Sequence, residues 1–114
     1  MSLPADVIIP RDKLTRYLLV MLPEHDKSQF LAQAGYTLAN PDALEAAIRE
    51  LVATHDAVWD RRTDYGDFYR VAGILRAVDG RDLAVVTVWI MRTDEAGSYR
   101  FVTLIPQRRQ PNAP

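Results

Sequence analysis

The stretch RDLAVVTVWIMR, from Arg81 to Arg92, decides the fold. Successive side chains of a strand point to opposite faces, so this stretch presents two faces that are both almost entirely apolar. One face carries Leu83, Val85, Thr87, Trp89 and Met91. The other face carries Ala84, Val86, Val88 and Ile90. A strand that needs cover on both faces is typical of the middle of a sheet, with paired strands beside it and helices above it.

Three helices are predicted before this strand. Apolar residues at helical spacing indicate the first over 11–21, ending near Pro23, and the second over 26–34, ending at Gly35. Asn40 and Pro41 supply a cap and a first-turn proline for the third, which continues to Thr54. Each helix has an apolar side that must be buried against another element.

After Thr54 the apolar period changes from helical to two, which predicts strands over 57–63, 68–78, 81–92 and 99–105. The turn signals Asp64-Tyr65-Gly66 and Asp79-Gly80 join neighbouring strands as hairpins. The predicted fold is therefore α+β, with N-terminal helices packed on one face of a four-stranded antiparallel meander sheet. Residues 1–9 are expected to form an arm or edge strand, 10–105 one domain, and 106–114 a disordered tail.

The two faces of the 81–92 strand lead to different expectations about a binding surface. If Ala84, Val86, Val88 and Ile90 meet the helices, then Thr87 and Trp89 look outward and mark a pocket or an interface. The alternative is that the faces are reversed, or that a loop, the N-terminal arm or a second subunit covers Trp89. A slip of one residue in strand register exchanges the two faces.

Composition limits the classes of function. With 14 basic and 15 acidic residues the formal charge is −1, so no global field recruits nucleic acid or an anionic membrane. The sequence has no cysteine, which excludes disulfides and cysteine nucleophiles and is compatible with a reducing compartment. No apolar run is long enough to span a bilayer, and residues 1–10 lack a signal-peptide pattern. We therefore expect a cytoplasmic protein without a membrane partner.

The connection from Pro23 to Lys27 is the best candidate for proton chemistry. It places His25 between Glu24 and Asp26, with Lys27 close by, a mixture able to move protons beside an anion. The alternative is a solvated loop that is rich in charge because loops face water. The second histidine, His55, follows the third helix, where it favours the structural role of complementing the carbonyl end of the helix dipole.

Two further groups of residues suggest ligand binding. A phosphate-binding patch is possible for the cations Lys13, Arg16, Lys27, Arg70 and Arg100, although such charges are common on solvated surfaces. Tyr65, Phe68 and Tyr69 can stack on a base or simply pack in a hairpin. No phosphate-cradling glycine loop, metal-ligand cluster or nucleophile elbow is present, so the sequence implies neither a metal nor another cofactor.

The order of short motifs resembles a small bacterial family catalogued as domain of unknown function sixty-eight eighty-three. In the front half the matching residues are Ile9-Pro10, Lys13-Leu14, Tyr17-Leu18-Leu19, Pro23-Glu24-His25, Lys27, Phe30 and Gly35-Tyr36. In the back half they are Asp64-Tyr65-Gly66, Tyr69, Thr87, Trp89-Ile90 and Val102-Thr103. The resemblance covers most of Ile9 to Ile105, and the family has no established activity.

The layout of that family resembles the fold of barnase, the EndoU nucleases, the colicin tRNases and RelE, many of which are metal-independent RNA-cleaving toxins. The analogy implies His25 as the acid–base group, Lys27 and Lys13 as phosphate contacts, and Thr87 or Thr103 as a positioning hydroxyl.

Two hypotheses follow from these observations. The first is a non-catalytic interaction domain that presents the sheet face around Thr87 and Trp89 to a protein partner or to a second copy of itself. The second is a toxin-like ribonuclease that uses His25 and Lys27 on RNA. They are distinguishable because the first requires Trp89 to be accessible, whereas the second requires cationic groups that converge on one site.

Overall fold

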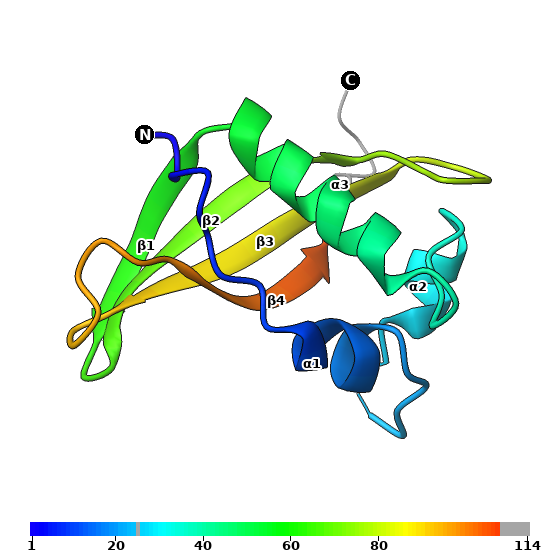
Figure 1. The fold of residues 1–114 in the computed structure, drawn as a ribbon, viewed down its shortest axis with the longest axis horizontal. Coiled ribbons are helices and arrows are strands. Elements are labelled where there is room, and N and C mark those ends of the chain that lie inside the picture. Colours follow the sequence, from blue (N-terminus) through cyan, green and yellow to red (C-terminus); the bar gives the residue numbers. More distant parts are fainter. Residues whose placement is uncertain (25, 108–114) are drawn as a thin grey trace, which may run out of the picture.

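The chain folds into helices and a sheet that follow one another in sequence order (Figure 1). The structure, a computed structural model, describes residues 1–24 and 26–107. The helical elements are α1 (Arg11–Lys13), the π-helix η1 (Leu14–Leu18), α2 (Ser28–Ala32) and α3 (Pro41–Thr54). The strands are β1 (Ala57–Thr63), β2 (Gly66–Leu75), β3 (Leu83–Arg92) and β4 (Arg100–Pro106). Since α1 runs directly into η1, three helical segments precede the sheet, as predicted.

The four strands form one antiparallel meander in the order β1-β2-β3-β4. The predicted α+β fold class and the central position of the Arg81–Arg92 stretch are therefore confirmed. Every residue of β3 pairs with β2, from Leu83 opposite Leu75 to Arg92 opposite Gly66. The helical segments lie on one side of the sheet, and α3 runs across β2 (Figure 1).

The core lies between the helical segments and one face of the sheet. From the strands it takes Val71, Leu75, Val85, Trp89, Phe101 and Leu104. From the helical segments it takes Leu14, Leu18, Leu31, Leu44, Ile48 and Leu51. Each of these side chains is at most 2% exposed, so the amphipathic helices and the sheet bury their apolar sides against each other.

The expectation that Thr87 and Trp89 look outward is wrong. Both are 0% exposed and face the helices, while Ala84, Val86 and Ile90 lie on the opposite face of the sheet. The Trp89 Nε1 atom donates to Thr87 Oγ1 at 2.8 Å, and that hydroxyl donates to the Val71 carbonyl at 3.0 Å. The Trp89 N–H and the Thr87 hydroxyl each have a hydrogen-bond acceptor inside the core, so neither donor is buried without a partner. The reversed-face alternative is the correct one.

The N-terminal arm is hydrogen-bonded to the edge of β4 that does not pair with β3. Ile8 forms a single parallel bridge with Arg100, in which the Ile8 amide donates to the Tyr99 carbonyl and the Phe101 amide donates to the Ile8 carbonyl, each at 2.8 Å. The side chains of Leu3, Val7 and Ile9 are buried. At the other end β4 includes Pro106, one residue beyond the predicted strand, and residues 108–114 of the predicted tail lie outside the described residues.

Candidate functional site

The first helical segment passes β4, the edge strand of the sheet (Figure 1). Four polar side chains meet beside this strand. We call Lys13, Tyr17, Lys27 and Thr103 the lysine–threonine cluster. Lys27 Nζ donates to Thr103 Oγ1 at 2.8 Å and to the Tyr17 hydroxyl at 3.4 Å. The Tyr17 and Thr103 hydroxyl oxygens are 3.5 Å apart. The ammonium groups of Lys27 and Lys13 lie 5.3 and 5.8 Å from the centre of the Tyr17 ring, within cation–π range.

Each member of this cluster comes from a different element. Lys13 ends α1, Tyr17 lies in η1, Lys27 directly precedes α2, and Thr103 lies in β4. Thr103 pairs with Val88 next to a bulge at which Phe101 pairs with Trp89. A bulge redirects side chains and is common beside active sites, as are π-helical turns such as η1. Two irregular segments thus position the hydroxyls of Tyr17 and Thr103.

The connection before α2 is held by Asp26. Its Oδ1 atom accepts hydrogen bonds from the Leu22 amide at 3.0 Å and from the Ser28 hydroxyl at 2.8 Å. These bonds favour the charged carboxylate, and they lower the pKa of Asp26, the Leu22 amide contributing most. The Asp26 carboxylate, next to Lys27 in sequence, therefore makes hydrogen bonds within its own loop.

The cluster also perturbs the tyrosine at its centre. The hydrogen bond with Thr103 lowers the pKa of the Tyr17 phenol, and the hydrogen bond and positive charge of Lys27 and the charge of Lys13 act in the same direction, against partial burial. A hydrogen bond or a nearby cation stabilises the phenolate relative to the phenol. Tyr17 is therefore a stronger acid than an isolated tyrosine.

The three aromatic residues predicted to stack on a base do not form one platform. Tyr65, in the β1–β2 turn, is 74% exposed and lines a pocket that also contains Lys13. Tyr69 packs against the core edge-to-face with Tyr99, their ring centres 5.3 Å apart. Phe68 lies under the Arg61 guanidinium, 4.5 Å from the ring centre. Tyr65 alone among them faces a pocket with cations.

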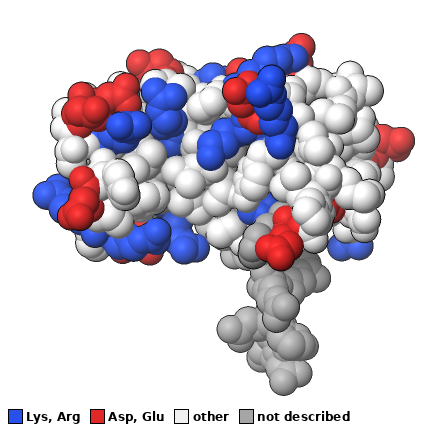
Figure 2. All heavy atoms as spheres, turned by 90° about the horizontal axis from the view of Figure 1, so that it is seen from below, with Lys and Arg blue, Asp and Glu red and all other residues white. Residues whose placement is uncertain are grey.

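The predicted phosphate patch is divided between several places. Lys13 and Lys27 lie together, but the Arg70 guanidinium pairs with Asp60 at 3.4 Å and Arg100 approaches Glu95 at 3.6 Å. Figure 2 shows the same mixture on one face of the molecule, where Lys and Arg side chains form several groups with Asp and Glu side chains among them. Any anion site is therefore local. The predicted acid–base residue, His25, lies outside the described residues.

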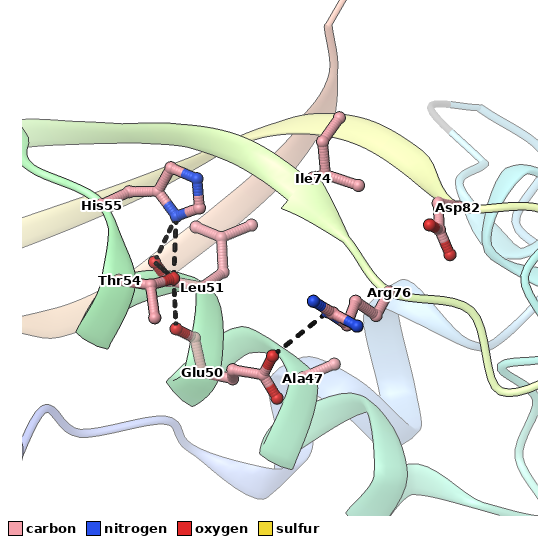
Figure 3. A pocket seen from close by; sticks show the side chains of 8 residues that line it. All are labelled: Ala47, Glu50, Leu51, Thr54, His55, Ile74, Arg76 and Asp82. Carbon is pink, nitrogen blue, oxygen red and sulfur yellow. Dashed lines mark hydrogen bonds and ion pairs between the residues drawn. The ribbon is translucent and has the colours of Figure 1, made fainter.

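A separate pocket of about 430 Å³ lies between α3 and the ends of β2 and β3 (Figure 3). His55 Nδ1 is 3.0 Å from the Leu51 carbonyl oxygen and 3.0 Å from Thr54 Oγ1, so the ring occupies the carbonyl end of α3, where the sequence places it. Across the pocket the Arg76 guanidinium pairs with Glu50 at 3.4 Å. Over residues 1–24 and 26–107, no three His, Asp or Glu side chains are grouped closely enough to hold a metal ion.

Comparison with known proteins assigns the family. Residues 4–108 match the family described as Domain of unknown function (DUF6883). The chain belongs to this family. A search of curated proteins found no match.

A solved structure shares the fold of this DUF6883 domain. It is a chain of the complex titled "Contact-dependent growth inhibition toxin - immunity protein complex from Klebsiella pneumoniae 342". The TM-score is 0.57 and the sequence identity 16%, and the match covers 92% of this chain and 97% of the other. At this identity the likeness concerns the fold alone. Within the part of the chain that the structure describes, no helix is both long and apolar enough to cross a membrane.

The contacts of Tyr17 with Lys27 and Thr103 were not predicted from the sequence. Tyr17 lies within the helix expected over 11–21, whose apolar side is expected to face the core. Lys13 and Tyr17 are four residues apart, however, and side chains at this spacing are neighbours on a helical surface. The sequence signal for the cluster was the spacing of Lys13 and Tyr17. The only other lysine of the sequence, Lys27, follows ten residues after Tyr17.

Proposed function

We propose that this DUF6883 domain is a toxin-like ribonuclease that cleaves RNA without a bound metal ion, using the lysine–threonine cluster. The observation that carries the proposal is the Lys27 ammonium, held 2.8 Å from Thr103 Oγ1 and 3.4 Å from the Tyr17 hydroxyl, with Lys13 on the same tyrosine ring. Both lysines of the sequence thus converge on one place that also offers two hydroxyl groups.

The arrangement suits a phosphodiester that gains negative charge. In the proposed reaction the ribose 2′-oxygen bonds to the adjacent phosphorus, the bond from phosphorus to the 5′-oxygen breaks, and the products are a 2′,3′-cyclic phosphate and a 5′-hydroxyl. Lys27 and Lys13 stabilise the charge on the phosphorane, as fixed cations do most effectively when they are already in place. Thr103 contributes by holding Lys27 in position.

Two proton transfers accompany this step. His25, two residues before Lys27 in the sequence, is proposed to take the proton of the 2′-hydroxyl. Tyr17 is proposed to give a proton to the leaving 5′-oxygen, since its lowered pKa makes it a better acid while it remains protonated. This assigns one group to each transfer.

The rival hypothesis was an interaction domain that binds a partner through the sheet face around Thr87 and Trp89. Thr87 and Trp89 are enclosed by the chain's own core, so they present nothing to a protein partner or to a second copy. Association with a protein partner or with a second copy of the chain stays a prediction. The shared fold with a chain of a toxin–immunity complex supports the toxin-like proposal through the fold alone.

The test is cleavage of a mixed RNA by the purified protein in excess chelator. Lys27→Met keeps the aliphatic stem and removes the charge, and we expect it to slow cleavage by at least about a hundred-fold. Thr103→Val removes a hydrogen bond to a charged group, which costs roughly 1.5–3 kcal/mol and slows cleavage by about ten-fold or more. Arg81→Ala removes an exposed cation outside the cluster and should retain the parent rate.

Circular dichroism melts of all four proteins distinguish a lost site from a lost fold. The proposal is wrong if the parent protein leaves RNA intact over a range of concentration and pH, or if folded Lys27→Met cleaves as fast as Arg81→Ala.

A further inference from the structure

A second pocket shares Lys13 with the lysine–threonine cluster. It has a volume of about 320 Å³. Its apolar lining comes from Ile90 on β3 and from Phe101 and Val102 on β4. Its cations are Lys13, Arg92 and Arg100, and the exposed ring of Tyr65 stands at its rim. We call this the basic pocket.

The cations of the basic pocket are only weakly neutralised. The Arg92 guanidinium is 3.3 Å from Asp94 and 3.9 Å from Glu95, and Arg100 is 3.6 Å from Glu95. These ion pairs are 36–67% exposed, and exposed pairs contribute little in water, so an entering anion can replace the carboxylates. The pocket therefore offers the partly exposed guanidinium groups of Arg92 and Arg100 to a phosphate.

The basic pocket adjoins the cluster. Lys13 belongs to both, and Val102 in the pocket lining directly precedes Thr103 in β4. A chain molecule with its scissile phosphate at Lys27 therefore places a neighbouring unit within reach of the pocket.

Resting on the function proposed above, we infer that the basic pocket binds one unstacked nucleotide of single-stranded RNA next to the cleaved phosphate. Its base lies against Tyr65 and the apolar lining, and its phosphate is bound by Arg92 and Arg100. An aromatic ring beside cations is the usual combination for single-stranded nucleic acid, because every base has a face that can stack and every nucleotide carries a phosphate. A base inside a duplex cannot enter, so the substrate class is single-stranded RNA or an RNA loop.

The first test measures binding with cleavage removed. A tetranucleotide with 2′-O-methyl riboses cannot undergo attack by the 2′-oxygen, and its affinity is measured by isothermal titration calorimetry. We expect Tyr65→Ala and Arg92→Gln each to weaken binding by about ten-fold, since both side chains are exposed and their loss leaves the core intact. Arg81→Gln, the matched removal of an exposed arginine outside the pocket, should bind as the parent does.

The outcomes separate the basic pocket from the proposed reaction. If Tyr65→Ala and Arg92→Gln bind the tetranucleotide as the parent does while Lys27→Met abolishes cleavage, the pocket is overturned and the reaction stands. If both variants lose binding but the parent cleaves no RNA, the pocket stands and the reaction fails. If polyglutamate binds at least as tightly as the tetranucleotide and with the same dependence on Arg92, the pocket recognises an acidic protein and the nucleotide assignment is overturned.

Discussion

The pKa values of individual side chains in this domain are shifted where the fold brings charged and hydrogen-bonding groups together. Tyr17 touches Thr103 and Lys27, and Asp67 receives bonds from Trp59 and Arg62. The resemblance to RNA-cleaving folds pointed to Lys13, Lys27 and Thr103, which the structure brings together. It also pointed to Thr87, which is buried. No local pattern reveals which threonine lies beside a lysine 76 residues away in sequence, because β4 and the η1–α2 connection meet only in the folded chain.

Tyr17 should ionise at a lower pH than Tyr36 and Tyr99. The cluster lowers its pKa, whereas burial raises the pKa values of Tyr36 and Tyr99. In an alkaline titration followed by tyrosinate absorbance, Tyr17→Phe should therefore remove a part of the transition that lies at lower pH than the ionisation of Tyr36 and Tyr99. Lys27→Met should move that part to higher pH, because the phenolate loses a cation and a hydrogen bond. If Tyr17→Phe instead loses absorbance only in the pH range where Tyr36 and Tyr99 ionise, the described contacts are contradicted.

Asp67 makes stability depend on pH in the acid range. Its hydrogen bonds with Arg62, at 2.9 and 2.8 Å, and with the Trp59 ring nitrogen lower its pKa from 3.8 to about 2. A carboxyl with a depressed pKa in the folded state stabilises the fold above its unfolded pKa, and this stabilisation is lost as pH falls from about 4 towards 2. Asp67→Asn should lower the melting temperature at pH 7 and show a shallower decline below pH 4. Thermal melts at pH 2–7 test this, and parallel curves for the two proteins would refute it.

At the scale of elements, the sequence pattern correctly predicts which segments are helices or strands and in what order they come. It does not predict which face of a strand is buried. The strand period and the turn signals at Asp64-Tyr65-Gly66 and Asp79-Gly80 give the meander correctly, because turn chemistry acts locally. The prediction of which face of β3 points away from the helices was wrong. Both faces of this strand are apolar, so the alternation of side chains cannot show which face is buried. The first helix was predicted to continue to Met21, but the structure ends η1 at Leu18, with the Leu19 amide donating to the Leu14 carbonyl at 3.0 Å.

The β1–β2 turn depends on glycine at position 66. Its φ of +150° is disfavoured for other residues, and an added Cβ would lie 2.2 Å from the Met91 carbonyl oxygen. Gly66→Ala should therefore destabilise the domain by about 3 kcal/mol through strain and overlap together. Gly97→Ala is the matched control, since its φ is +85° and nothing lies within 4 Å, and it should cost only about 1 kcal/mol. Urea denaturation compares them, and equal losses would show that Met91 gives way freely.

For the molecule as a whole, the sheet is the scaffold and its β4 edge carries the proposed chemistry. The N-terminal arm, the first helical segment and the connection before α2 all lie along this edge. Composition argued against a global attraction for nucleic acid, and the mixed surface in Figure 2 agrees with a formal charge of −1. The proposed recognition of RNA therefore relies on the few cations of the cluster and the basic pocket.

Product analysis on a matched pair of dinucleotides tests the central claim most directly. A ribonucleotide dimer and its 2′-deoxy counterpart are incubated with the protein in excess chelator, and the products are identified by mass spectrometry. The proposed reaction predicts a 2′,3′-cyclic phosphate and a 5′-hydroxyl from the first and no cleavage of the second, because the attacking oxygen is missing. Equal cleavage of both dimers, or a ribonucleotide dimer left intact by the parent protein, would contradict it.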